Sequence, residues 1–168
     1  MKRFIAVLAV CFFAVSMGFA QSNNSIIGFW QTIDDKTKEP KSVVSVYEKG
    51  GAVFAKIIVV YTNGKLDVVK NADGNFVASK VRTAPKMNNQ PYVGLEIVKD
   101  LRLDKNGRYS GGTIVDPNKG GDPYRAEVWL DNDNGDLKVR GKLGPFYRTQ
   151  TWKSFPKSNF PEGFKITE

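Results

Sequence analysis

Tight-turn dipeptides divide this sequence into short segments of the length of β-strands. They stand at Asn63-Gly64, Asp73-Gly74, Asn106-Gly107 and Asn134-Gly135, and Gly50-Gly51 separates two runs rich in Val, Ile, Phe and Tyr, residues 43–48 and 52–61. Asn, Asp and Gly tolerate the positive φ that tight hairpin turns require. Regular turn spacing between short apolar runs predicts successive antiparallel hairpins.

Later segments alternate with a period of two. Tyr124, Ala126, Val128 and Leu130 share one face of residues 124–130, whereas Arg125, Glu127 and Trp129 share the other; residues 136–141 alternate likewise. Such alternation is typical of a strand with one buried face. Further strands are predicted at 26–32 and 148–153, a loop at 34–41, and either a short helix or a strand at 94–101. These segments predict an all-β fold with little helix, arranged as either a sandwich or a barrel, and we expect a single antiparallel β-barrel of about eight strands.

The N-terminal twenty residues have the pattern of a signal peptide. Lys2 and Arg3 precede an apolar run from Phe4 to Val15, and small residues lead to a cleavage site between Ala20 and Gln21. We therefore expect export to the periplasm or beyond. The expected organisation is a signal peptide at 1–20, a flexible lead-in at 21–25, a barrel domain at 26–155 and a tail over the surface at 156–168.

Residue types absent from the chain exclude several chemistries. There is no histidine, and the only cysteine, Cys11, lies in the apolar run that cleavage would remove. Catalysis based on His or Cys and a transition-metal site are therefore excluded, and we expect no enzyme activity and no cofactor. The net charge of +8 is spread along the chain, which favours a solvated surface. We expect no nucleic-acid partner and no transmembrane segment in the mature protein.

Carboxylates leave two weaker alternatives. The acidic segment 131–136 has alternating oxygens, but its glycine stands at the fifth position and no glutamate closes the loop, so a hairpin turn is a better interpretation than a calcium site. A glycosidase-like enzyme would need two acidic side chains converging in a cleft. Most carboxylates here stand beside Gly or Asn in predicted turns, which explains them without catalysis.

Aromatic side chains are the best candidates for ligand contacts. They can line a cavity or fill the core. We expect five residues to contact a ligand, four of them aromatic and one an arginine suited to an acidic group of the ligand: Tyr47, Tyr124, Trp129, Arg140 and Trp152.

An ordered set of short motifs extends from Ile27 to Trp152. It comprises Gly28-Phe29-Trp30, Ser42-Val43-Val44, Tyr47-Glu48, Val53-Phe54-Ala55-Lys56-Ile57, Gly94-Leu95-Glu96-Ile97, Gly111-Gly112-Thr113-Ile114-Val115-Asp116-Pro117, Leu137-Lys138-Val139-Arg140-Gly141 and Arg148-Thr149-Gln150-Thr151-Trp152. In these motifs the chain resembles the bacterial domain-of-unknown-function 2147 family. The resemblance implies an exported protein with a lipocalin-like barrel and no known activity. The Gly28-x-Trp30 motif also resembles the entry motif of lipocalins, and that resemblance implies structural roles in barrel closure for Gly28, Trp30 and Arg148, with the Arg148 guanidinium packed over the Trp30 ring.

Two functions follow as hypotheses. The first is non-enzymatic binding of a small apolar, amphipathic or acidic ligand inside the barrel, which predicts a cavity of at least about 300 Å³. The second is an envelope interaction or stress-related module that contacts a protein or cell-wall polymer through its outer surface, with Lys138, Arg140 and Lys153 as candidate contacts. The second hypothesis predicts a filled barrel.

Overall fold

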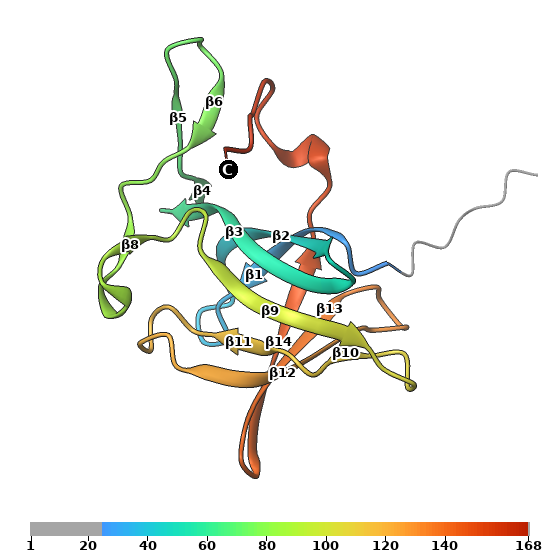
Figure 1. Ribbon diagram of the computed structural model, residues 1–168. Helices are drawn as coiled ribbons and strands as arrows, with labels where there is room; N and C mark the ends of the chain where they lie inside the picture. The colour runs from blue at the N-terminus through green and yellow to red at the C-terminus, as the bar shows by residue number, and fades with distance from the viewer. Residues whose placement is uncertain (1–24, 168) are drawn as a thin grey trace, which may run out of the picture.

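A closed antiparallel barrel forms the centre of the molecule in the computed structural model, which describes residues 25–167 (Figure 1). Its wall has eight positions, one of which is shared by two short strands: β1 (Gly28–Ile33), β2 (Pro40–Lys49), β3 (Ala52–Thr62), β9 (Glu96–Leu103), β10 (Tyr109–Ser110) with β11 (Thr113–Val115), β12 (Pro123–Leu130), β13 (Leu137–Leu143) and β14 (Phe146–Ser154). β14 pairs with β1, and β3 pairs with β9, so that the sheet closes on itself. The all-β barrel prediction is confirmed.

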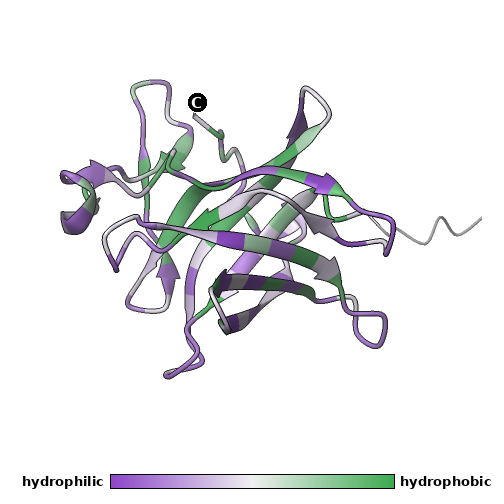
Figure 2. Cartoon of the chain, turned by 60° about the horizontal axis from the view of Figure 1, so that its bottom comes forward, coloured by the Kyte–Doolittle hydropathy of each residue, from purple (hydrophilic) through white to green (hydrophobic). Residues whose placement is uncertain are grey.

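Hairpin turns fall where the dipeptides predict them. Asn63-Gly64 joins β3 to β4, Asn106-Gly107 joins β9 to β10, and Asn134-Gly135 belongs to the connection between β12 and β13. Figure 2 shows that the green apolar bands are concentrated on the strands, where they alternate with polar ones, and that most connecting loops are purple or white. Residues 94–101 form no helix, because β9 takes up most of them and pairs with β3 and β11.

A segment of small elements lies between β3 and β9. It contains β4 (Lys65–Leu66), β5 (Val68–Lys70), β6 (Phe76–Ala78), β7 (Thr83–Ala84), the 3₁₀ turn η1 (Pro85–Met87) and β8 (Gln90–Pro91). Part of this segment packs on the outside of the barrel, where Ala78, Leu66 and Val68 contact a second hydrophobic cluster. Only this part of the segment therefore packs against the apolar residues on the outer side of β3.

Strand β3 is buried on both faces, which explains its continuous apolar run. Val60 and Ile57 belong to the main core inside the barrel, whereas Ile58 and Val59 belong to the outer cluster. The pairing register shifts here by one residue, since Val43 lies opposite Val59 and Val44 opposite Ile57. This β-bulge turns neighbouring apolar side chains towards two different cores.

Gly112 occupies the break between β10 and β11. A Cβ at this position would lie 2.0 Å from the carbonyl oxygen of Lys99, so the close approach of the two backbones requires glycine. Its carbonyl oxygen accepts a hydrogen bond from the Ala126 amide at 2.9 Å. The glycine therefore keeps the interrupted strand attached to both of its neighbours.

The C-terminal residues contribute to the outer cluster. Phe160 stacks on Phe164 at 4.7 Å between ring centroids and packs edge-on against Phe29 and Phe155. The 3₁₀ turn η2 (Lys157–Asn159) leads into this contact. The tail thus lies over the barrel surface as expected, but it packs into a hydrophobic cluster there. The expected loop at 34–41 is shorter than predicted, because β2 begins at Pro40.

The expected signal peptide at 1–20, Cys11 within it, and residues 21–24 of the lead-in lie outside the described residues. Between residues 25 and 167, no helix has both the length and the apolar character needed to cross a membrane.

Candidate functional site

The barrel is hollow towards one end. A cavity of about 460 Å³ opens among the C-terminal ends of β1, β3, β11 and β13 and the N-terminal ends of β2, β9, β12 and β14. Volumes of this size are usual for pockets that hold small organic ligands. Strand order places these eight ends at the same rim because neighbouring strands run antiparallel.

The deep part of the cavity is apolar. Trp152, which is only 2% exposed, lies there with Val139, Ile57 and Ile97. The indole Nε1 of Trp152 donates a hydrogen bond to the Gln150 side-chain oxygen at 3.2 Å, which satisfies its polar atom. The buried surface at this end therefore suits the hydrocarbon part of a ligand.

Gly141 widens the wall next to Tyr124. A Cβ on Gly141 would lie 3.3 Å from Cγ2 of Ile114 and 3.4 Å from Cβ of Tyr124. Because Gly141 and Tyr124 face the same cavity from β13 and β12, the missing side chain leaves room for the tyrosine ring. Tyr124 therefore lines the cavity, as the sequence predicts.

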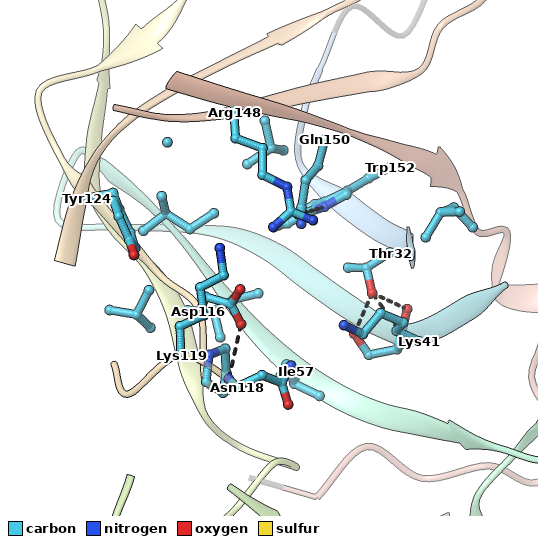
Figure 3. A pocket seen from close by; sticks show the side chains of 18 of the residues that line it. Thr32, Lys41, Ile57, Asp116, Asn118, Lys119, Tyr124, Arg148, Gln150 and Trp152 are labelled. Atoms are coloured by element: carbon cyan, nitrogen blue, oxygen red, sulfur yellow. Dashed lines mark hydrogen bonds between the residues drawn. The ribbon is translucent and has the colours of Figure 1, made fainter. Parts of the chain in front are cut away.

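The mouth is rich in cations. Four basic side chains line the cavity, whereas Asp116 is its only carboxylate among the described residues: Lys41, Arg82, Lys119 and Arg148. Figure 3 shows Arg148 and Lys119 extending into the space from different elements, β14 and the loop after β11, with Asp116 beside Lys119. An excess of positive charge in a partly desolvated cleft attracts anions.

Two aspartates hold the mouth cations without neutralising all of them. Arg148 Nε donates to Oδ2 of Asp35 at 2.6 Å, and Lys41 Nζ lies 3.4 Å from Oδ2 of Asp34. The amides of Thr37 and Lys36, with the Lys41 charge, lower the pKa of Asp34 to about 2. Asp34 therefore stays ionised at neutral pH and fixes the β1–β2 loop at the rim.

Tyr61 and Tyr92 also border the cavity, and the Tyr61 side chain packs against the outer cluster as well. Gln31 Nε2 donates to the Tyr61 hydroxyl oxygen at 2.6 Å, and burial raises the pKa of this tyrosine. Arg82 donates to the Tyr61 carbonyl at 2.9 Å and lies over the Tyr92 ring at 5.9 Å. The short elements between β3 and β9 thereby supply one cation of the mouth.

Three predicted ligand-binding residues do not face the cavity. Tyr47 lies on the outer side of β2, where its hydroxyl donates to Glu96 at 2.6 Å and its ring stacks on Phe54. Burial and the Glu96 carboxylate raise the pKa of Tyr47 to about 12, so the phenol stays protonated. The physical reason is strand alternation: Val46 and Val44 point inward, and the residue between Val46 and Glu48 must point outward.

Trp129 and Arg140 also face outward. The Trp129 ring lies 4.4 Å from the guanidinium of Arg108 and 4.8 Å from that of Arg140, and Arg140 also covers Tyr147 at 4.6 Å. Glu127 links the cations, with Arg108 at 2.5 Å and Lys142 at 2.6 Å. These groups form a cation–aromatic cluster that stabilises the outside of the barrel wall.

Arg148 does not pack over Trp30. Trp30 lies opposite Ser154, six positions along β14 from Arg148, which corresponds to about 20 Å of extended strand. Trp30 is buried in the main core, and its indole Nε1 donates to the Ile26 carbonyl at 2.8 Å. Gly28 begins β1 at the same end. Arg148 therefore belongs to the open end of the barrel and Trp30 to the closed end.

Several cavity residues were not predicted. Gln150 shares a face with Arg148 and Trp152, so strand alternation gives a signal for it. Lys41, Arg82 and Lys119 stand at strand ends or in connections far apart in sequence, and only the closure of the barrel brings them together. No local pattern marks these three residues as neighbours.

The carboxylate alternatives find little support in this geometry. Asp116 has no second acid beside it among the described residues that line the cavity, whereas a carboxylate-pair mechanism needs two. The acidic segment 131–136 is a turn, in which the Gly135 amide donates to the Asp131 carbonyl at 2.8 Å. Asp131 and Asp136 bind Lys138 and Lys153, and residues 25–167 contain no group of three or more potential metal ligands.

Comparison with known proteins agrees with this architecture. Over 80% of this chain and 85% of the other, the fold matches that of protein HP1028 from the human pathogen Helicobacter pylori, described as belonging to the lipocalin family, with a TM-score of 0.56 and 24% identity. No curated protein matches the chain in sequence. The family model for an uncharacterized protein conserved in bacteria (DUF2147) matches residues 28–154. The chain thus belongs to the DUF2147 family and has a lipocalin-like fold.

Proposed function

We propose that this protein binds a small amphipathic ligand, with the apolar part in the barrel and an anionic group at the mouth. The observation that carries the proposal is the polarity gradient of one cavity. Its deep end is formed by Trp152 and aliphatic side chains, and its rim carries four cations and one carboxylate. Burial of hydrocarbon contributes about 25 cal/mol per Å², and guanidinium groups bind carboxylates or phosphates with directed hydrogen bonds.

The hollow interior favours ligand binding over the interaction hypothesis, since the latter predicts a barrel filled by side chains. The fold of HP1028, which is described as a lipocalin, supports the same choice by analogy. An exported location would place the ligand outside the cytoplasm. That part of the proposal rests on the signal-like pattern of residues 1–20.

Matched substitutions on one strand test whether the cavity is the site. Gln150→Trp adds bulk inside the cavity, whereas Thr151→Trp adds the same bulk at the next position, which faces outward and accepts from Lys138. Titration with a dansylated fatty acid should show binding weakened at least about tenfold in the first variant and unchanged in the second. Equal affinity in both variants would place the ligand elsewhere.

The anionic group is tested by comparing the fatty acid with its methyl ester. Arg148→Ala should weaken binding of the acid by about tenfold or more and leave the ester nearly unaffected, because only the acid offers a charge-assisted acceptor. Arg125→Ala is the matched control, since Arg125 lies on the outward face of β12. Mass spectrometry of lipids that co-purify with the wild-type chain identifies the natural ligand class. Failure of both probes and an empty purified protein would refute the proposal.

A further inference from the structure

The end of the β13–β14 hairpin carries an exposed apolar group. Leu143, Phe146 and Tyr147 are 63%, 76% and 67% exposed, and they stand within five residues of one another. Figure 1 shows this hairpin extending as a narrow ribbon beyond the rest of the barrel. Exposed apolar side chains scattered singly need no explanation, but a group gathered at a projecting end marks a contact surface.

The turn at this end is itself without charge. Gly144 and Pro145 connect Leu143 to its cross-strand partner Phe146, and Gly144 has a φ of +57°, which suits the first central position of a two-residue hairpin turn. The ribbon therefore ends in five consecutive uncharged residues, 143–147. Tyr147 follows on the opposite face of the ribbon.

Cations stand one or two positions behind the apolar end. Lys142 is the cross-strand partner of Tyr147, and Arg148 follows Tyr147 in β14. Arg125 lies opposite Lys142 on the neighbouring strand β12 and has no ion pair among residues 25–167. Glu127 and Asp35 bind Lys142 and Arg148, whereas Arg125 on the outer face of β12 and Lys119 at the cavity mouth form no ion pair within the part of the chain that the structure describes.

We propose that this hairpin end inserts into the interface of an anionic phospholipid bilayer. The apolar and aromatic side chains at the hairpin end match the acyl chains of such a bilayer. The Lys and Arg side chains next to them match its negatively charged head groups. A two-stranded ribbon is only about 5 Å wide between strand axes and is convex at its end. A stable protein partner needs about 800 Å² from each side, which three side chains do not supply.

The hairpin end lies next to the mouth of the cavity, which relates the membrane contact to ligand binding. Leu143 and Phe146 also border the mouth of the cavity, so a bilayer at the hairpin end would face the opening. An amphipathic molecule would then pass between bilayer and barrel over a short, partly apolar path. The membrane contact stands on the hairpin alone, whereas this transfer rests on the proposed function as well.

Binding to vesicles tests the contact directly. The chain from Gln21 is used, because residues 4–15 are apolar enough to bind membranes themselves and because the strand pairings of the barrel and both hydrophobic clusters lie in residues 26–164. It should float with phosphatidylcholine vesicles that contain phosphatidylglycerol, more weakly with phosphatidylcholine alone, and less at high salt. Combined Leu143→Ser, Phe146→Ser and Tyr147→Ser should weaken partitioning at least about tenfold.

Matched variants distinguish insertion of the hairpin end from nonspecific hydrophobic adsorption to vesicles. Val81→Ser with Leu103→Ser removes exposed apolar side chains elsewhere on the molecule and should leave vesicle binding unchanged. Because the chain from Gln21 lacks cysteine, a single environment-sensitive fluorophore at Phe146→Cys reports on the hairpin end and one at Leu103→Cys on the closed end of the barrel. Only the first fluorophore should shift to shorter wavelength with anionic vesicles. Arg125→Glu should reduce the preference for anionic lipid, whereas Arg102→Glu should not.

Four outcomes would overturn the inference. The first three are absence of vesicle binding by the wild-type chain, undiminished binding by the triple variant, and an equal response of both fluorophores. The fourth is a wild-type chain that is dimeric in solution and does not bind vesicles, together with a triple variant that is monomeric. The last outcome would assign the surface to a second copy of the chain. Titration of the wild-type chain with the dansylated fatty acid in the absence of vesicles tests the proposed function separately, so each failure is recognisable.

Discussion

Arg140 and Arg148 occupy neighbouring register positions of one hairpin and point to opposite sides of the barrel wall. Arg148 lies opposite Gly141, the residue next to Arg140, and faces the cavity, where it binds Asp35. Arg140 lies between Trp129 and Tyr147 on the outside and donates to the Thr149 hydroxyl at 2.9 Å. One side chain therefore belongs to the candidate ligand site and the other to the stability of the wall.

Alanine at these two positions should separate stability from binding. Arg140→Ala removes two cation–aromatic contacts and should lower the free energy of unfolding by about 1–2 kcal/mol, with ligand affinity unchanged. Arg148→Ala should weaken fatty-acid binding and cost less than about 1 kcal/mol, because its partly exposed ion pair with Asp35 contributes little. Urea denaturation and probe titration of both variants check this. If Arg140→Ala weakened binding and Arg148→Ala lowered stability, the placement of the two residues would be contradicted.

Glu127 should make stability depend on pH. Hydrogen bonds from Lys142, opposed by desolvation and assisted by Arg108, lower the pKa of its carboxyl from an ordinary value of 4.5. Because the pKa of Glu127 is lower in the folded than in the unfolded state, the ionised carboxyl stabilises the fold fully at pH values above the unfolded-state pKa. This stabilisation is lost as the pH falls through the folded-state pKa. Glu127→Gln should therefore cost about 1–3 kcal/mol at pH 7 and progressively less below pH 4.5. Lys142→Met should weaken the same pH dependence. If urea denaturation gives the same difference in the free energy of unfolding between wild type and Glu127→Gln at every pH, the prediction is contradicted.

Two glycines should differ sharply in their response to alanine. Gly112→Ala places a methyl group 2.0 Å from the Lys99 carbonyl oxygen and should cost about 3 kcal/mol or more. Gly141→Ala meets only the Ile114 and Tyr124 side chains at 3.3 Å or more and should cost less than about 1.5 kcal/mol. Thermal unfolding of the pair tests the close approach of β9 to the β10–β11 break. Similar melting temperatures would show that the backbones can separate.

Phe160 should stabilise the fold without affecting the cavity. It joins Phe29, Phe155 and Phe164 in the outer cluster, which is separate from the main core. Phe160→Ala should lower the free energy of unfolding by about 2–4 kcal/mol and leave affinity for the fatty acid unchanged. Ile166→Ala, at a side chain that is 44% exposed, should stay within about 0.5 kcal/mol of the wild type. A change in affinity with Phe160→Ala would show that the two clusters are coupled.

The N-terminal prediction needs a test in cells. If residues 1–20 act as a signal peptide, the protein in the periplasmic or extracellular fraction should begin at Gln21, which mass spectrometry of the intact chain detects. Replacing apolar residues between Phe4 and Val15 by charged ones should keep the full-length chain in the cytoplasm. Full-length protein in the exported fraction would indicate that the segment is an uncleaved anchor.

Strand alternation indicates which side chains face the cavity better than aromatic character does. Tyr124, Val128 and Trp152 lie on the inward faces of their strands, whereas Trp129 lies with Arg125 and Glu127 on the outward, charged face. Aromatic character alone suggested a ligand contact for Trp129, and the period of two indicated the opposite side of the wall. For residues in regular strands, alternation is the more reliable guide because it follows from backbone geometry.

By itself the sequence determined the all-β class, most of the long strands of the barrel and several of its hairpin turns, because turn dipeptides and alternating side chains act over a few residues. Only the tertiary structure decided that the barrel has a cavity, that Arg148 lies at its mouth and not over Trp30, and that Lys41, Arg82 and Lys119 meet there. These features depend on how β14 closes on β1 and β3 on β9, and on loops separated by dozens of residues. Register and loop placement result from long-range packing, which no local pattern records.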